Sequence, residues 1–414
     1  MTERNTPMKS IYQEFYAHNA QDSSFLWLLR SVKIEQPHCH SQEIHTLEQR
    51  IETRLDGLMS APDPGWQACE AALALQEPGE IFAAMVTAMR SHDSGKIKTA
   101  VDTGLENALA TPGLISAMGW LPNALANPWT DRFLNGKEMA HKYLGLATCS
   151  VRRQNPGERL TQILQRDDCR QHEQLYCRAL RLIGELHRQD CIPALQLAMQ
   201  DDNDNIRFWA IWSSVLLGHR ANTHSLQEFV FKAGPYQHLA TQMAFRTLPI
   251  DQAREWIDQL LTDKSQIRTV IKATSALGDP HAIDWLIDTM NTPALAKLAG
   301  ESFTTLTGID LERHQLTRDA DSSQSDPDND SPKQDEDEGL PTPDAEKVAA
   351  LWCQQSPHYI AGQRYFMGQP IGAKHLKEIL ANGTQRQRHA AALELALSES
   401  DTPLPNTRAR ILTS

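Results

Sequence analysis

Histidines and cysteines that lie close together are the first residues of this chain to consider for metal chemistry. His38, Cys39 and His40 follow one another, and Glu43 and His45 come soon after them. Imidazole and thiolate bind zinc, but a zinc site usually draws them as two close pairs from well-separated parts of a chain. The second pair is missing here. We therefore expect an exposed polar turn between two helices, and we predict no metal and no cofactor.

Nucleophilic catalysis finds little support in the sequence. Cys169 and Cys177 lie near His172, but nothing in the neighbouring sequence would lower the pKa of either thiol. The chain also lacks the GxSxG turn of serine hydrolases, the GxxxxGK[ST] phosphate loop and the GxGxxG dinucleotide turn. We therefore predict no catalytic residue and a protein without enzymatic activity.

Arginines beside aromatic residues are better candidates, because Trp, Tyr and Arg dominate the hot spots of protein interfaces. Arg207, Trp209 and Trp212 share one predicted helix, with the two tryptophans one turn apart. A packing role is the competing interpretation for both tryptophans, since tryptophans in stacked helices mostly fill the core. Their exposure decides between the two interpretations.

A second candidate group lies near the C-terminal end of the sequence. Arg364 and Tyr365 occupy a loop over residues 359–370 that glycines and a proline bound, and Arg386 and Arg388 belong to the predicted helix behind it. We predict that these four residues contact a protein partner.

Arginines also recur near the start of second helices, at Arg207, Arg268 and Arg388. In a repeat array such an arginine usually pairs with an acid of the same or the adjacent repeat. The functional alternative is a row of cations that holds an acidic partner or the acidic segment of this chain. Deleting residues 319–338 would test that alternative.

The elements that position these residues follow a repeating pattern. A turn signal recurs at intervals of about thirty residues, each time after an apolar helical stretch. Its glycines are Gly119, Gly145, Gly184, Gly218, Gly278 and Gly308, and Thr247-Leu248-Pro249 takes the place of one more. In the clearest units, over residues 171–308, we expect the glycine to end the second helix in the left-handed conformation. Because one helix pair cannot bury its own apolar face, neighbouring pairs must stack. The pattern predicts an all-α, HEAT-like helical-repeat solenoid of antiparallel helix pairs.

Composition divides the chain into four predicted regions. These are an N-terminal helical cap (1–60), a HEAT-like array (61–316), a disordered acidic linker (317–343) and a small C-terminal helical block (344–414) that we expect to pack back on the array. Within the linker, residues 319–338 hold nine acids and one base. Such a segment buries too little apolar surface to offset the entropy of ordering it.

Charge and hydropathy exclude several classes of partner. The net charge is −12, and no long segment supplies the basic stripe that nucleic acids require. No apolar run is long enough for a membrane span. The seven cysteines are scattered without CxxC pairs, which indicates a reducing compartment. We therefore predict a soluble cytoplasmic protein with no nucleic-acid partner.

Short motifs spread in order over nearly the whole chain carry a resemblance to a known group of proteins. They are FLWLLR (25–30), LDGL (55–58), LISAMGW (114–120), RFWA (207–210), AGESF (299–303), TGID (307–310), the segment 341–352, Arg364-Tyr365 and QRQR (385–388). With them the chain resembles an uncharacterised proteobacterial HEAT-like family whose genes commonly lie in type VI secretion clusters.

That resemblance implies a cytoplasmic accessory protein of contact-dependent secretion. It favours an adaptor that presents an effector or a spike component, and it supplies no catalytic residues to transfer. An immunity protein for a co-encoded toxin is an alternative binder. A HEAT-repeat enzyme, such as a bilin lyase or an alkylpurine DNA glycosylase, is less favoured: the cysteine placement implies no bilin, and the acidic chain lacks the glycosylase's basic groove.

Overall fold

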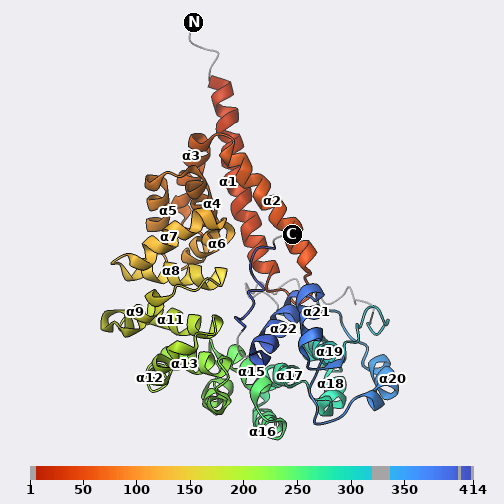
Figure 1. The fold of residues 1–414 in the computed structure, drawn as a ribbon. Helices are drawn as coiled ribbons and strands as arrows, with labels where there is room; N and C mark the ends of the chain where they lie inside the picture. The colour runs from red at the N-terminus through yellow and green to blue at the C-terminus, as the bar shows by residue number, and fades with distance from the viewer. Residues whose placement is uncertain (1–5, 319–335, 400–401, 412–414) are drawn as a thin grey trace. The chain divides into compact units, whose positions relative to one another are not determined.

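The computed structural model describes residues 6–318, 336–399 and 402–411 of the chain (Figure 1). These residues are mostly helical, and the described sheet is one short hairpin of β1 (Tyr365–Phe366) and β2 (Gln369–Pro370). The predicted all-α helical-repeat fold is therefore confirmed. None of the helices in the described ranges has both the length and the apolar character to cross a bilayer.

The fold separates into two compact units. Unit 1 comprises residues 1–35, 39–186 and 405–414, and unit 2 comprises residues 36–38 and 187–404. The predicted boundary between cap and array, at residue 60, thus lies inside unit 1, and the predicted array 61–316 contributes to both units. The final ten residues of the predicted C-terminal block belong to unit 1.

Unit 1 is built from helices joined by short turns. Its helices are α1 (Thr6–Lys33), α2 (Ser41–Met59), α3 (Pro62–Ala72), α4 (Pro78–Ser91), α5 (Ser94–Glu106), α6 (Thr111–Trp120), α7 (Asn123–Asn135), α8 (Met139–Arg152), α9 (Glu158–Gln165), α10 (Asp167–Arg170) and α11 (Glu173–Glu185).

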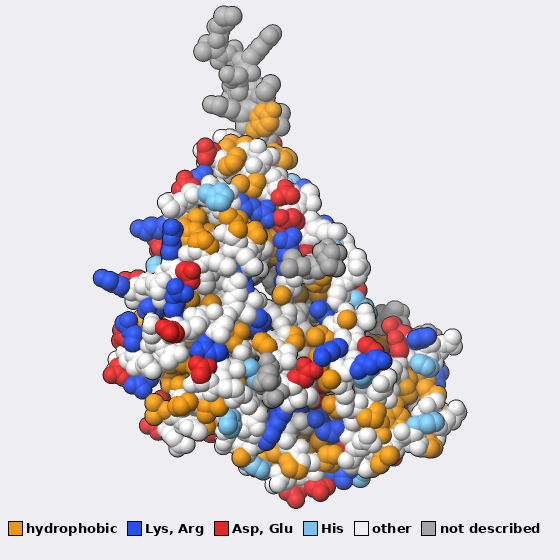
Figure 2. All heavy atoms as spheres, in the orientation of Figure 1, with side chains coloured by type: hydrophobic (Ala, Val, Ile, Leu, Met, Phe, Trp, Pro, Cys, Tyr) orange, Lys and Arg blue, Asp and Glu red, His pale blue; other side chains and the backbone are white. Residues whose placement is uncertain are grey.

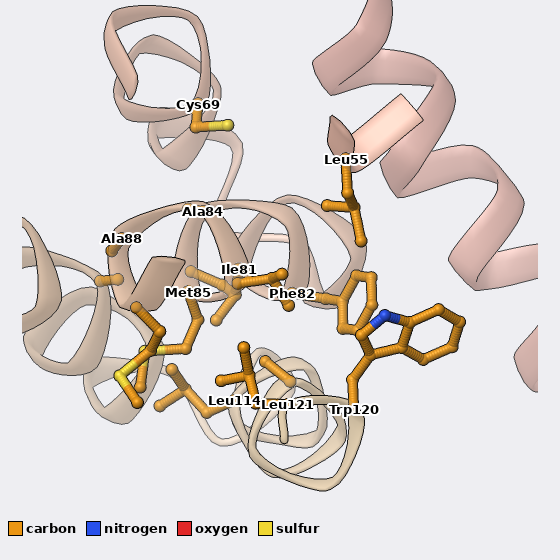
Figure 3. Packing of buried hydrophobic residues seen from close by; sticks show 14 of the residues in the cluster. Leu55, Cys69, Ile81, Phe82, Ala84, Met85, Ala88, Leu114, Trp120 and Leu121 are labelled. Atoms are coloured by element: carbon orange, nitrogen blue, oxygen red, sulfur yellow. The ribbon is translucent and has the colours of Figure 1, made fainter. Parts of the chain in front are cut away.

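Helix α4 is the centre of unit 1. Every residue from Ile81 to Met89 is buried, as expected for a helix that is apolar on all sides. The Phe82 ring stacks on Trp27 of α1 at a centroid distance of 5.9 Å and meets the Trp120 ring edge-on at 5.4 Å. Figure 3 shows Phe82 between Leu55 and Trp120. These aromatic contacts join α1, α4 and α6.

Three of the predicted helix-ending glycines belong to helices and are not left-handed. Gly145 lies in the middle of α8, while Gly119 and Gly184 are the second-to-last residues of α6 and α11. A Cβ atom at Gly145 would lie 2.9 Å from the Leu134 side chain, and one at Gly119 would lie 3.2 Å from Val151. At these two positions, therefore, the small residue permits a close approach of neighbouring elements. The prediction that the glycine ends its helix is wrong for Gly145, whereas α6 ends one residue after Gly119.

Unit 2 continues the helical architecture. Its helices are α12 (Ile192–Ala198), α13 (Asp204–Leu216), α14 (Gln227–Phe231), α15 (Gln237–Thr247), α16 (Ile250–Leu261), α17 (Ile267–Leu277), α18 (Ile283–Thr289), α19 (Pro293–Thr307), α20 (Ala345–Gln355), α21 (Ala373–Asn382) and α22 (Gln385–Ser398).

Two glycines of unit 2 end their helices as predicted and also contact the loop over residues 359–370, which we call the C-terminal loop. Gly278 ends α17 at φ 72° and Gly308 ends α19 at φ 68°, both left-handed. The Tyr365 N–H donates to the Gly278 carbonyl at 2.7 Å, and a Cβ atom at Gly308 would lie 2.6 Å from the Met367 carbonyl oxygen. Any side chain at these glycines would push the loop away. The C-terminal helices thus pack back on the repeats of unit 2.

The prediction of a disordered linker concerns mainly residues 319–335, which lie outside the described residues. Both flanks of that segment are described, and they are joined. Thr317 pairs with Pro343 in an antiparallel bridge, and the Arg318 N–H donates to the Thr342 carbonyl at 3.0 Å. Residues 317–318 and 336–343 are therefore held in defined contacts.

Candidate protein-binding site

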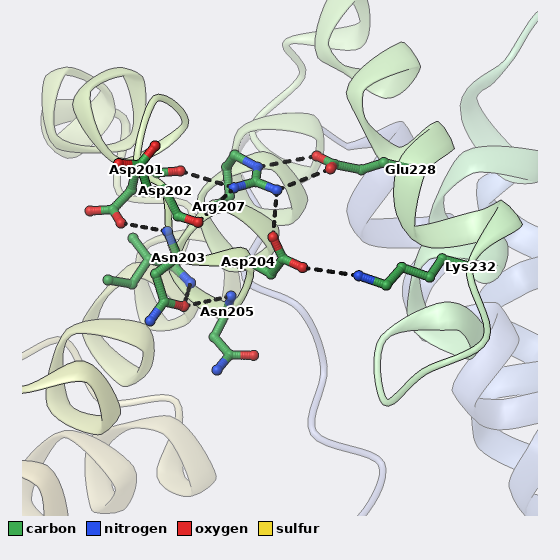
Figure 4. Close-up of polar contacts among 9 residues, drawn as sticks. Asp201, Asp202, Asn203, Asp204, Asn205, Arg207, Glu228 and Lys232 are labelled. Atoms are coloured by element: carbon green, nitrogen blue, oxygen red, sulfur yellow. Dashed lines mark hydrogen bonds and ion pairs between the residues drawn. The ribbon is translucent and has the colours of Figure 1, made fainter.

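Arg207 of the first candidate group joins neighbouring repeats (Figure 4). Its guanidinium contacts Asp204 at 2.7 Å on its own helix and Glu228 of α14 at 3.0 Å. It also donates to the carbonyls of Asp201 and Asp202 in the preceding turn. Hydrogen bonding to Glu228 raises the pKa of Arg207. The predicted pairing with acids of the same and the adjacent repeat is confirmed.

The two tryptophans beside Arg207 belong to the aromatic core of unit 2. Trp212 is buried and Trp209 is half-buried, and their rings meet edge-on at 5.6 Å. The fully buried Phe208 stacks on Tyr236 at 4.1 Å. Most of the Trp212 surface is therefore unavailable to a partner, and the predicted contact of this group with a partner stays a prediction.

Arg364 connects the C-terminal loop to the end of α17. It donates to the carbonyls of Leu277 at 2.8 Å and Ala276 at 3.2 Å, which would otherwise lack helical partners. It also pairs with the buried carboxylate of Glu394 on α22, where Arg246 approaches within 3.3 Å. Burial lowers the pKa of Arg246 to about 10, against the effect of Glu394. Tyr365 beside Arg364 is buried. Both residues hold the fold of unit 2 together.

The two arginines of α22 differ in what they contact. Arg388 donates to the Leu380 carbonyl at 2.9 Å near the end of α21 and also contacts the Gln385 side chain. Arg386 pairs with Glu301 of α19, while its second nitrogen donates to the Glu336 carbonyl at 3.0 Å. Arg386 therefore reaches the acidic segment, whereas Arg388 links α21 and α22.

Three cations converge on the described end of that acidic segment. Arg268 holds Asp337 with two parallel hydrogen bonds of 2.8 and 2.9 Å, and Lys272 contacts the Glu336 carboxylate at 2.6 Å. With Arg386 they form what we name the α17–α22 basic cluster: Arg268, Lys272 and Arg386. The forked guanidinium–carboxylate pair is the strongest and most directional contact of this kind.

The basic cluster shifts the pKa values of two nearby carboxyl groups in opposite directions. The hydrogen bond from Lys272 holds the pKa of Glu336 below its usual range, although burial opposes this. Burial raises the pKa of Glu301, and Arg386 acts against that effect. Glu301 pairs with Arg386, and Asp337 and Glu336 supply the opposite charge for Arg268 and Lys272.

Sequence reasoning identified Arg268 and Arg386 but missed Lys272 and Glu301. A spacing signal did exist for Lys272, because it follows Arg268 by four residues and so lies on the same face of a helix. No local signal links Arg268 to Asp337, since 69 residues separate them.

The described residues do not form a metal site, and Cys169 is not an activated thiol. Among residues 6–318, 336–399 and 402–411, no three His, Cys, Asp or Glu side chains gather as a metal site requires. Burial, with Asp168 nearby, raises the pKa of Cys169.

On the face in Figure 2, basic side chains are interspersed with acidic ones. The predicted absence of a nucleic-acid partner stays a prediction.

Comparison with known proteins adds no relative: no family model, no curated protein and no solved structure matches this chain. The functional conclusion therefore depends on the geometry of the basic cluster.

Proposed function

We propose that this chain is a non-enzymatic protein-binding scaffold whose unit 2 recognises an acidic segment of a partner protein through the α17–α22 basic cluster. The observation that carries the proposal is the pairing of Arg268 and Lys272 with Asp337 and Glu336. A partner's Asp or Glu residues offer the same carboxylates, so they compete for the same cations. The chain's own residues 336–337 are then the intramolecular occupant.

The biological setting of the proposal comes from the family resemblance. It supports an adaptor in the cytoplasm that presents an effector or a spike component of a type VI secretion system. Helical repeats suit this task because stacked pairs offer a long surface to a protein ligand.

A binding experiment with defined variants tests the cluster. The probe is a fluorescent peptide with the sequence of residues 334–340, and anisotropy is the measurement. The double variant Glu336→Gln/Asp337→Asn weakens the internal occupant, so we expect it to bind the peptide at least about tenfold more tightly than the parent. Adding Arg268→Ala, Lys272→Ala and Arg386→Ala should abolish that binding.

The control is Lys232→Ala on the double variant, because Lys232 is an exposed cation outside the cluster. Arg364 and Arg388 are left unchanged, since their loss would disturb the fold. Equal binding by the cluster variant and the control would contradict the proposal, as would no binding by a folded double variant. A pull-down from the native cytoplasm then asks whether the double variant recovers a secretion spike or effector protein that the cluster variant does not.

A further inference from the structure

Residues 405–411 lie on the helices of unit 1 and are held there through their main chain. Arg30 of α1 donates to the Arg408 carbonyl at 3.0 Å, and the Ile411 N–H donates to the Glu48 carboxylate of α2 at 2.9 Å. Asn406 adds a side-chain hydrogen bond of 2.7 Å to the Val151 carbonyl. Main-chain contacts of this kind bind a segment with little regard to its sequence.

The two arginines of the segment make the contacts that depend on sequence. The Arg410 guanidinium lies 4.4 Å from the centre of the Trp120 ring, and one of its nitrogens is 3.2 Å from the Glu52 carboxylate. Arg408 pairs with Glu35 at 2.8 Å. A cation over an indole face beside a carboxylate is a strong arrangement for recognising arginine.

The receiving residues also contact one another and other residues of unit 1. Arg30 and Glu48 form a buried ion pair of 2.7 Å, with exposed side-chain fractions of 6% and 2%. Glu52 accepts from Arg90 at 2.5 Å and from the Trp120 indole at 2.8 Å. Burial would raise the pKa of Glu52, but Arg90, Trp120 and Arg410 together lower it. Glu48 and Glu52 thus have partners outside residues 405–411, and preorganisation of this kind favours affinity.

Residues 405–411 are less buried than the Arg30–Glu48 ion pair that they contact. Each residue from 405 to 411 is half-buried or exposed, and none is buried. Their attachment therefore depends on hydrogen bonds, ion pairs and one aromatic contact, and little on apolar burial. Another chain with the same groups can make the same contacts.

We propose that Arg30, Glu35, Glu48, Glu52 and Trp120 form a recognition site for an Arg-x-Arg segment of a partner protein, with residues 405–411 as the exchangeable intramolecular occupant. We name it the Glu48–Glu52 site. It lies within unit 1 and does not depend on the function proposed for unit 2. Its acidic and aromatic character defines the partner as a protein with a basic segment.

The test uses the full chain and a fluorescent, terminally capped peptide with the sequence of residues 405–411. Arg408→Ala/Arg410→Ala weakens the internal occupant, so this variant should bind the peptide at least about tenfold more tightly than the parent. Adding Glu35→Gln and Glu52→Gln should weaken that binding by at least about tenfold. Glu43→Gln is the matched control, because Glu43 is an exposed carboxylate of α2 that pairs with Lys33.

A peptide with both arginines replaced by glutamine should not bind. Thermal unfolding shows whether each variant is as folded as the parent. Failure of a folded Arg408→Ala/Arg410→Ala variant to bind would overturn the proposal, and so would binding that Glu35→Gln/Glu52→Gln leaves unchanged. Light scattering addresses one other occupant: a parent dimer that this arginine variant loses would assign the site to a second copy and overturn the proposal.

Discussion

The α17–α22 basic cluster of unit 2 and the Glu48–Glu52 site of unit 1 hold segments of opposite charge by different means. Unit 1 places a buried ion pair, Arg30–Glu48, under its segment and uses main-chain contacts. Unit 2 relies mainly on side chains, and its Arg268 is 36% exposed although Asp337 is buried. Both partners of the ion pair are thus buried at the first site, whereas the cation is partly exposed at the second. Similar charge pairing can therefore contribute very differently to stability.

Removing one carboxylate from each site should expose this difference most strongly. Glu48→Ala leaves the buried Arg30 without its carboxylate, and we expect a loss of about 3–5 kcal/mol in the free energy of unfolding. Asp337→Ala removes a buried carboxylate, but its partner Arg268 is 36% exposed and can be hydrated, so we expect a smaller loss of about 1–2 kcal/mol. Urea titration followed by circular dichroism measures both. Equal losses would contradict the distinction between an ion pair buried on both sides and one whose cation is partly exposed.

Acid should weaken the attachment of residues 336–343 and 405–411, because the carboxylates that hold or belong to them become protonated. The fold lowers the pKa values of Glu52 and Glu336. Each carboxylate therefore stabilises the folded state at pH values above its unfolded pKa, and this stabilisation is lost as the pH falls through the lowered pKa. We expect both segments to stay protected near about pH 5 and to lose protection towards about pH 3. Hydrogen exchange of peptides covering 336–343 and 405–411, corrected for intrinsic rates, measures this. Loosening that begins as pH rises above 5 would have the wrong sign.

Salt should change hydrogen exchange least of these treatments, and it should affect the two sites to different extents. Raising the ionic strength from about 0.05 to about 0.5 M screens exposed pairs much more than buried ones. Residues 336–337 should therefore gain exchange modestly, while residues 405–411 change less because their main-chain hydrogen bonds remain. Hydrogen exchange at fixed pH provides the measurement. A larger response at 405–411 would show that its arginines, and not its main chain, dominate the attachment.

Much of the fold could be predicted from sequence periodicity, because helices with one apolar face leave a clear pattern. Gly278 and Gly308 end their helices as expected, whereas Gly119 and Gly145 lie inside helices at close approaches. A glycine after an apolar stretch looks the same locally in both roles. Only the identity of the neighbouring element distinguishes them.

The sites were less predictable, because their parts come from distant positions. The acidic segment and the arginines near the starts of helices suggested an internal pairing, and Arg268 does contact Asp337. The Glu48–Glu52 site was missed, since Glu48 and Ile411 are 363 residues apart. Arg408 and Arg410 carried a signal in their spacing, but nothing local links them to Glu35 in the turn after α1 or to Glu52 on α2.

The path of the chain gives the attachment of residues 405–411 a further consequence. Unit 1 contains sequence from both before and after residues 187–404, so the chain leaves unit 1 and returns to it with the segment. A tethered segment meets its own site at an effective concentration on the order of millimolar. A free competitor of equal intrinsic affinity must reach that concentration to displace half of it. Binding constants measured on the parent chain will therefore understate the affinity of the site itself.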